Sequence, residues 1–385
     1  MKNSLQISGL ALFSILLSPA LHAKEDIPSR LTHFTEISEI GEEGTKVPLN
    51  TYTRLEVISG EAGQSIGYAK RPLLFRISIG KKYLTNILLH AESGRFTAAT
   101  PLVSREYVSS SERGESFVRE VSYDAYDFPL FLVGSQNGGV ASFSITIDTD
   151  ETSDTSITAI SLGAVTKALN TVAPGSGVVT ALTADSTAQV ASEIDQAAGK
   201  ASSTSVREKS DFDVKLSEGA QLLLRVRGPE LETNELNADK VLGEWTIRFS
   251  QAQPSIFSDV KCAENIGERC AAVDGSSIEP ALAAYQQAIS DPGTVLSYEL
   301  IDKIGNVGTI SAFLSQQEWW ADGLSALASS DPGYGQFCRS IRKAVGSIGL
   351  NDLDGRIIAT SFANSGVVDD DAMTGLLESS DCKYQ

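Results

Sequence analysis

Apolar and polar residues alternate along the first half of the chain. Between about residues 31 and 149, four stretches place apolar side chains at every second position, which is the period of a half-buried β-strand. These stretches are 54–57, 74–79, 117–121 and 141–147. Turn residues separate them, and the Asn137-Gly138 pair is typical of a tight hairpin. The pattern predicts antiparallel β-structure, arranged as a sandwich or as a barrel-like sheet.

The alternating pattern returns after residue 205. Three further stretches, 212–216, 222–226 and 245–249, are again alternating or continuously apolar. The pattern leaves open whether these strands complete the first sheet or form a second domain. We favour two similar β modules.

A segment rich in Ala, Ser, Thr and Gly, residues 152–205, lies between the two β regions. Apolar residues recur three or four positions apart from Ile157 to Val172, which is the stripe of an amphipathic helix. Pro174 and the glycines that follow it interrupt this pattern. Ser186 and Gln189 then have the spacing of a capping box, so a second helix is expected. The segment is predicted to be a helical hairpin.

Two interpretations of this hairpin are open. Its small side chains suit a pair of helices that covers a sheet, and we favour this interpretation. The alternative is a segment released to enter a membrane, although neither half has the ~20 consecutive apolar residues that spanning a bilayer requires.

From about residue 277 the period becomes helical. Pro280 suits the first turn of a helix, and helices are expected to end at the Asp-Pro-Gly runs 291–293 and 331–333. Each run is followed by another helical segment, which reaches Gly305 or Gly346. The predicted fold class is α+β, with an antiparallel β-sandwich-like N-terminal region, a helical hairpin insertion and a mainly α-helical C-terminal domain. The expected parts are 1–23 (signal peptide), 24–151 (β-rich domain), 152–205 (helical hairpin), 206–256 (second β-rich segment) and 257–385 (α-helical, disulfide-stapled domain).

The start of the chain has the parts of a secretory signal peptide. Lys2 precedes an apolar run from Leu10 to Leu17, and small residues lead to Ala23 before charged residues begin. We expect cleavage near Ala23 and a periplasmic or secreted mature protein.

The cysteines agree with export. All four, Cys262, Cys270, Cys338 and Cys382, lie in the last third of the chain, and an oxidising compartment would pair them. Of three connectivities, we favour Cys262 with Cys270 and Cys338 with Cys382. A zinc site is the rival interpretation, but no Cys-x-x-Cys pair and no nearby histidine support it. We expect no metal and no cofactor.

The charge of the chain excludes one class of partner. A formal net charge of −18 repels phosphate backbones, so nucleic acid is not an expected partner. Residues 256–385 carry 8 Lys or Arg and 18 Asp or Glu, whereas residues 70–82 are locally basic. We interpret the basic cluster as solvated strand faces. The alternative is a docking patch for an anionic glycan, a lipid headgroup or the acidic C-terminal domain. The basic residues are Lys70, Arg71, Arg76, Lys81 and Lys82.

Candidate catalytic patterns are weak. Ser340 and Lys343 have the spacing of a lysine-activated serine, but the partner motifs of such enzymes are absent and an exposed basic helix face is the simpler interpretation. The run 351–355 resembles a calcium loop only in its middle, since Leu350 and Ser361 occupy its first and last ligand positions. Asn351 is better explained as a helix cap, with Asp354 near the positive end of that helix.

Paired carboxylates are a further candidate for catalysis. Asp124 and Asp127, or Asp369 to Asp371, are of the type that hydrolyses glycans. For Asp369 to Asp371 we favour an acidic first turn of a helix. No catalytic residue is assigned from the sequence.

Trp319 and Trp320 form the most conspicuous aromatic pair. Neighbours on a helix lie about 100° apart, so at most one of them points straight into a core. Core packing is favoured, and contact with a partner is the alternative.

Three functions follow in order of preference. The first is an exported, non-catalytic binding or assembly protein of a bacterial-type cell envelope or secretome, with an unidentified protein or envelope component as its partner. The second is an envelope glycan or peptide hydrolase that uses carboxylates. The third is a membrane-active protein that uses the helical hairpin.

Overall fold

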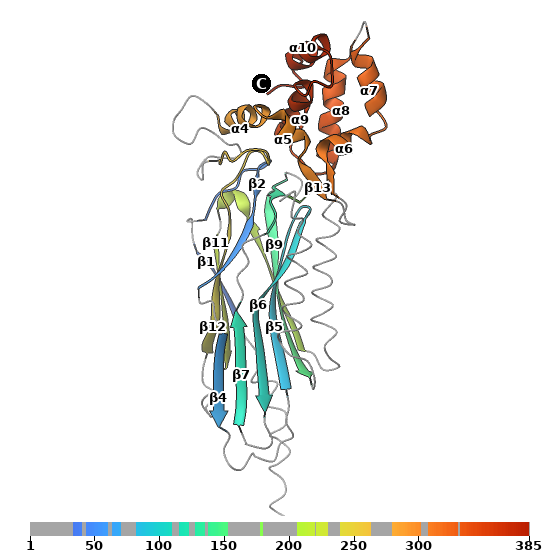
Figure 1. The fold of residues 1–385 in the computed structure, drawn as a ribbon. Coiled ribbons are helices and arrows are strands. Elements are labelled where there is room, and N and C mark those ends of the chain that lie inside the picture. Colours follow the sequence, from blue (N-terminus) through green and yellow to red (C-terminus); the bar gives the residue numbers. More distant parts are fainter. Residues whose placement is uncertain are drawn as a thin grey trace, which may run out of the picture.

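The chain forms an elongated body of β-strands with a helical domain at one end (Figure 1). The computed structural model describes residues 34–40, 44–60, 64–70, 82–109, 115–122, 128–134, 138–152, 178–179, 206–219, 221–229, 239–262, 279–301, 307–329 and 332–384. The predicted signal peptide and the strand expected at 74–79 lie outside these residues. Of the segment predicted to be a helical hairpin, 152–205, only Thr152 and residues 178–179 are described.

Two antiparallel sheets make up the β-body. The larger sheet has the order β10-β9-β5-β6-β7-β4, and the smaller has the order β1-β11-β12-β3. The strands of the larger sheet are β4 (Gln64–Lys70), β5 (Lys82–Ser93), β6 (Phe96–Ser109), β7 (Glu115–Ser122), β9 (Val140–Thr152) and β10 (Val206–Lys215). Those of the smaller sheet are β1 (Phe34–Ile40), β3 (Leu55–Ser59), β11 (Gln221–Pro229) and β12 (Asp239–Phe249). A short pair, β2 (Tyr52–Thr53) with β8 (Phe131–Leu132), lies beside the helical domain.

The strands follow the alternation of the sequence. In β9, Phe143 and Ile145 are buried while Ser142 is exposed, and in β12 Ile247 and Phe249 are buried while Arg248 is exposed. Successive side chains of a strand point to opposite faces, so each strand contributes one apolar row to the interior.

Both sheets contribute to one hydrophobic core. The rings of Phe143 in the larger sheet and Phe249 in the smaller sheet have centroids 6.1 Å apart. Phe96 and Phe131 stack with centroids 4.4 Å apart and an interplanar angle of 15°. Burial of each such side chain contributes roughly 1.5–3 kcal/mol. The core therefore joins residues from both β regions of the sequence.

The interpretation of two similar β modules is wrong. β10 pairs with β9 in the larger sheet, and β11 and β12 pair with β1 and β3 in the smaller one. Strands from both sides of the 152–205 segment thus share each sheet. The apolar alternation that we used records which face of a strand is buried, and it contains no information on which strand lies beside it.

The hairpin expected at Asn137-Gly138 is also wrong. Gly138 and Gly139 do adopt positive φ, at 65° and 70°. However, β8 before this turn pairs with β2, and β9 after it pairs with β5 and β10. A Cβ atom on Gly139 would lie 2.9 Å from Cδ2 of Leu49. Gly139 therefore allows the chain to pass from the short β2–β8 pair to β9 of the larger sheet.

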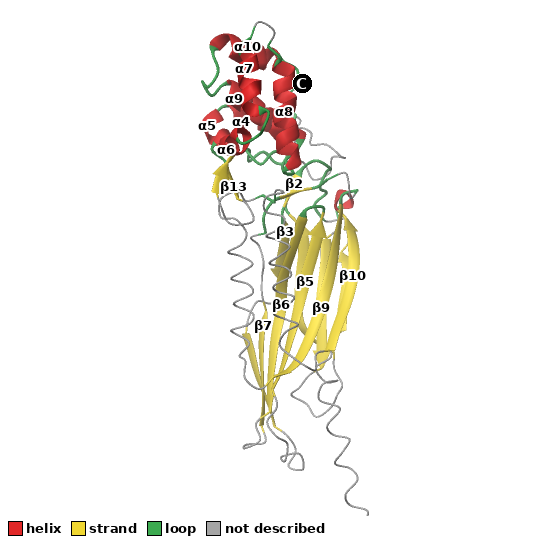
Figure 2. Ribbon diagram, turned by 90° about the vertical axis from the view of Figure 1, so that its right-hand side faces the viewer, coloured by secondary structure: helices red, strands yellow, loops and turns green. Residues whose placement is uncertain are grey.

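The C-terminal domain is mainly helical, as expected (Figure 2). Its helices are α4 (Pro280–Ile289), α5 (Pro292–Leu296), α6 (Ile310–Ser315), α7 (Trp320–Leu327), α8 (Tyr334–Ser347), α9 (Asp352–Ala363) and α10 (Asp370–Glu378). Nine of the twelve residues of α9 are buried. It packs against α4, α5, α8 and α10, so α9 is the centre of this domain.

One helix boundary was predicted incorrectly. Asp291 ends the α4 region, but its carboxylate also accepts a hydrogen bond from the N–H of Thr294 and so begins α5. The helical segment expected after the 291–293 run is present as α5 but ends at Leu296 and does not reach Gly305. β13 (Glu299–Ile301) follows it and pairs with β14 (Val307–Thr309). Leu300 of β13 is buried in the helical core, which explains its apolar character without a helix.

Candidate functional site

A buried disulfide clips the end of the chain onto α8. Cys338 and Cys382 are bonded, their Cα atoms lie 5.2 Å apart, and both side chains are fully buried. This pairing was predicted. Cys262 is also disulfide-bonded, and its expected partner, Cys270, lies outside the described residues.

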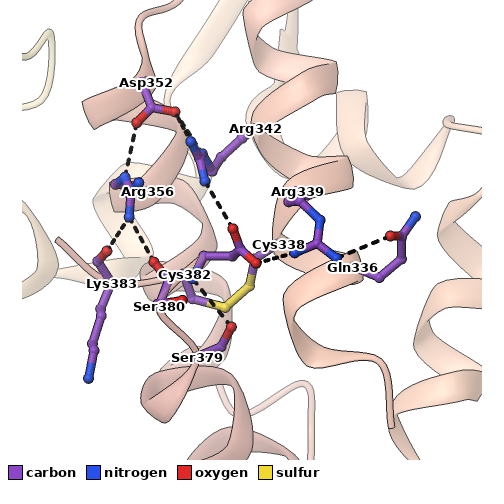
Figure 3. Close-up of polar contacts among 11 residues, drawn as sticks. Gln336, Cys338, Arg339, Arg342, Asp352, Arg356, Ser379, Ser380, Cys382 and Lys383 are labelled. Carbon is purple, nitrogen blue, oxygen red and sulfur yellow. Dashed lines mark hydrogen bonds and ion pairs between the residues drawn. A yellow bond between two sulfur atoms is a disulfide. The ribbon is translucent and has the colours of Figure 1, made fainter. Parts of the chain in front are cut away.

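Charged side chains surround this disulfide and join three parts of the helical domain (Figure 3). Arg342 of α8 donates from Nε to Oδ1 of Asp352 at the start of α9 over 2.7 Å, and its Nη1 lies 3.5 Å from Oδ1 of Asp381. Arg356 of α9 contacts the other oxygen of Asp352 over 3.0 Å and donates to the carbonyl of Ser380 over 2.9 Å. Exposed ion pairs contribute little individually. Their linkage into a network orients α8, α9 and the C-terminal residues.

The structure gives no support to Ser340 and Lys343 as a lysine-activated serine. Ser340 is half-buried and Lys343 is exposed on α8. Within the part of the chain that the structure describes, the two side chains share no hydrogen bond.

Asn351 forms the main polar contact between the β-body and the helical domain. Its Oδ1 accepts a 2.9 Å hydrogen bond from the N–H of Asp354 and caps α9, as predicted. Its Nδ2 donates to the carbonyls of Asn50 and Pro254, both over 2.9 Å, and its backbone N–H donates to the hydroxyl of Tyr52 over 2.8 Å. One residue therefore starts the central helix and holds it on the β-body.

A second contact lies nearby. Nη1 of Arg95, in the turn between β5 and β6, donates to the carbonyl of Ser347 over 3.1 Å. That carbonyl lies at the C-terminal end of α8, where the partial negative charge of the helix favours a cation. The ends of α8 and α9 thus both rest on the β-body.

Asp354 lies fully buried at this junction. Burial disfavours the ionised carboxylate and raises its pKa from 3.8 to about 7. The hydroxyls of Ser255 and Tyr52 and the N–H of Ile256 act in the opposite direction. However, neither carboxylate oxygen reaches ordinary hydrogen-bond geometry with another described residue. We therefore attribute the raised pKa to desolvation that these donors offset only in part.

Aromatic hydroxyls share this environment. The pKa of Tyr52 is raised by burial and by the adjacent Asp354, and the pKa of Tyr298 is raised for the same reasons. Arg54, on the β side, acts to lower the pKa of Tyr298. The junction therefore contains a buried cluster of polar groups.

Sequence reasoning missed this cluster. It assigned Asp354 only to the positive end of a helix. A signal was present, because Leu350, Asp354, Ile357, Ile358 and Ser361 recur at helical spacing and all prove to be buried. Nothing local in the sequence marks Tyr52 as the partner of this face.

The predicted tryptophan pair lies on the helical domain and is half-buried. Trp320 packs against Phe337 and Phe362, with ring centroids 5.4 and 5.1 Å apart. Trp319 packs against Phe337 at 5.6 Å. Both rings border the helical core, and part of each is open to solvent.

Of the paired carboxylates, the structure describes only Asp369 to Asp371. The side chain of Asp369 caps α10, and Asp370 and Asp371 form its first turn, as expected. Asp124 and Asp127 lie outside the described residues. Among the described side chains, no group of three His, Cys, Asp or Glu is arranged to hold a metal ion.

The basic strand cluster is only partly described. Lys70 and Lys82 stand at strand ends, where they pair with Glu115 and Thr152. The opposite end of β5 leads to Arg95, which contacts the helical domain. Arg71, Arg76 and Lys81 are outside the described residues.

None of the described helices combines the length and the apolarity needed to cross a bilayer. Val179, inside the predicted hairpin, is buried in the β core, and its N–H donates to the carbonyl of Leu130 over 2.6 Å. A charged substitution at Val179 would therefore disturb core packing.

Comparison of the chain with protein-family models, with curated proteins and with solved structures finds no match.

Proposed function

We propose that the protein is an exported binding or assembly protein of a bacterial-type cell envelope or secretome, which acts through contact with a protein or envelope component. The observation that carries the proposal is the preorganised aromatic pair Trp319 and Trp320. Two half-exposed indoles held by ring contacts offer a large contact area at low cost in side-chain entropy. Export is supported by the buried disulfide, a type of bond that persists in oxidising compartments.

The position of the helical domain supports the same proposal. It lies at one end of a β-body whose longest strand, β6, has 14 residues and spans roughly 45 Å. Exposed Glu318 and Asp322 flank the two tryptophans. We propose that this acidic, aromatic end contacts a partner that carries positive charge.

The proposal also concerns the fold of residues 152–205. We propose a β-sandwich with a helical hairpin beside it. β9 and β10 pair from Thr149 with Val206, so the segment leaves and re-enters the same end of the sheet. Its middle residues, 178–179, lie at the opposite end, where Val178 bridges Leu130. Roughly 25 residues lie between the end of β9 and Val178. A helix of about 25 residues would rise about 38 Å, which is close to the length of β9, about 40 Å.

Site-specific photo-cross-linking in the native envelope tests the proposed contact. A cross-linking residue at Asp322 or Ser325, both exposed on α7, should capture a discrete partner. The same residue at Glu92 or Ser142, exposed on β5 and β9, should not. Asp322→Lys should reduce capture from Ser325 at least fivefold, whereas the matched variant Glu92→Lys should leave it unchanged.

Two outcomes would contradict the proposal. Equal capture from the β-body positions would remove the assignment to the helical end. Hydrolysis of peptidoglycan or peptides by the purified protein, lost in Asp124→Asn, would favour the hydrolase instead.

A further inference from the structure

The contact between the β-body and the helical domain encloses a carboxyl group. Asp354 is fully buried, and none of the ion pairs in the described part of the chain involves it. The hydroxyls that face it, those of Tyr52 and Ser255, come from β2 and from the segment that follows β12. Asp354 is on α9, so the two sides of this contact belong to different domains.

We propose that Asp354 makes the junction a proton-sensitive clamp, which is tight when the carboxyl is protonated and loosens when it ionises.

The geometry favours the neutral carboxyl in the closed junction. A protonated carboxyl can donate to a facing hydroxyl, whereas an ionised one needs several well-aligned donors or a cation. Asn351, three residues earlier, already uses its backbone N–H and its side chain to bind Tyr52, Asn50 and Pro254. The hydrogen bonds of Asn351 between the domains therefore lie beside Asp354, whose ionisation is disfavoured in the closed junction.

The other groups around Asp354 keep their charge state as it titrates. Tyr52 and Tyr298 stay neutral because burial raises the pKa of each above its ordinary value of 10. Arg54, on the β side, stays positive. On the α8 side, Arg342 packs beside Gly355 and is paired with Asp352 and Asp381. A pH response of this junction is therefore assigned to Asp354.

The direction of the response follows from linkage. Asp354 in the closed junction has a pKa of about 7, and after opening it returns toward 3.8. Between these values the open state has lost a proton that the closed state keeps. The equilibrium constant for opening should rise about tenfold per pH unit from about pH 4 and level off above about pH 7.

Hydrogen exchange of the full-length protein tests this clamp. The amide of Asn351 is a direct reporter, because its N–H donates to Tyr52 across the junction. Its protection factor, corrected for the pH dependence of intrinsic exchange, should fall by at least a hundredfold from pH 4.5 to pH 7.5 and then become constant. In Asp354→Asn the protection should be independent of pH. In Asp352→Asn, an exposed neighbour on the same helix, the wild-type response should remain.

A constant protection factor in the wild type would overturn the clamp, and so would an unchanged response in Asp354→Asn. If Asp354→Asn does not fold by near-ultraviolet circular dichroism, Ser255→Ala replaces it. The Ser255 hydroxyl lowers the pKa of Asp354, so its removal should move the plateau to higher pH. An unmoved plateau would also reject the proposal.

Discussion

Asn351 shows how much one side chain contributes at this junction. Its oxygen caps α9, and its amide nitrogen satisfies two backbone carbonyls of the β-body. A buried carbonyl that loses its donor costs about 1–3 kcal/mol, and a lost helix cap costs about 1 kcal/mol. Because the bond to the Asn50 carbonyl is only part-buried, its full cost does not apply, and the three contacts together contribute about 2–4 kcal/mol.

Replacement of Asn351 should be correspondingly costly. We expect Asn351→Ala to lower the free energy of unfolding by about 2–4 kcal/mol, measured by denaturant titration. Asn364 is the matched control, because it is exposed at the end of the same helix and its side chain bonds, among the described residues, only to the carbonyl of Thr360. Asn364→Ala should change stability by less than about 0.5 kcal/mol. Equal effects of the two variants would show that the junction contacts of Asn351 contribute nothing.

At the scale of elements, the Cys338–Cys382 disulfide holds the C-terminal residues against the core of the helical domain. Residues 379–384 follow α10 and are held by the Cys338–Cys382 bond, by Arg356 and by the hydrogen bond from Thr360 to the carbonyl of Cys382. The bond closes a loop with a sequence separation of 44 residues. Such cross-links stabilise chiefly by restricting the unfolded chain.

The double variant Cys338→Ala, Cys382→Ala should therefore lose about 2–4 kcal/mol of stability. Because the polar contacts of this region remain, α8 should stay folded while residues 379–384 become sensitive to limited proteolysis. Ser380→Ala, an exposed neighbour that leaves the disulfide intact, should be as resistant as the wild type. Equal proteolysis of the wild type and the double variant would contradict the structural role assigned to the bond.

The elements also show what the sequence was able to predict. Helix α9 and its cap at Asn351, the first turn of α10, and the alternation of β9 and β12 depend on neighbours within a few residues, and these predictions are confirmed. Strand partners depend on contacts that are remote in sequence, such as Val206 with Thr149 or Phe34 with Arg227. The single shared core was missed for that reason.

The candidate site divides in the same way. The Cys338–Cys382 pair and the conspicuous Trp319–Trp320 pair are visible as residue types in the sequence. The environment of Asp354 is not, because its partner Tyr52 is separated from it by about 300 residues. A buried carboxylate is recognised only when the side chains of both domains are placed around it.

At the scale of the whole molecule, two cores meet at a contact that includes a titratable group. The raised pKa of Asp354 has a definite sign in the pH dependence of stability. Its contribution is complete below the unfolded-state pKa of 3.8 and is lost as the pH rises to about 7. The loss amounts to at most about 4 kcal/mol, since each pKa unit corresponds to about 1.4 kcal/mol.

The effect of Asp354→Asn on stability should therefore be more favourable at neutral pH than at acidic pH. The difference in unfolding free energy between Asp354→Asn and the wild type should become more favourable to the variant by a few kcal/mol from pH 4 to pH 7.5, because an amide stays neutral throughout. Denaturant titrations across this range measure the difference. Subtracting the wild type removes the repulsion among the many other carboxylates of this acidic chain, which acts equally on both proteins. A difference that is constant with pH would mean that Asp354 is ionised in the folded protein, with its facing hydroxyls and the N–H of Ile256 acting as full hydrogen-bond donors.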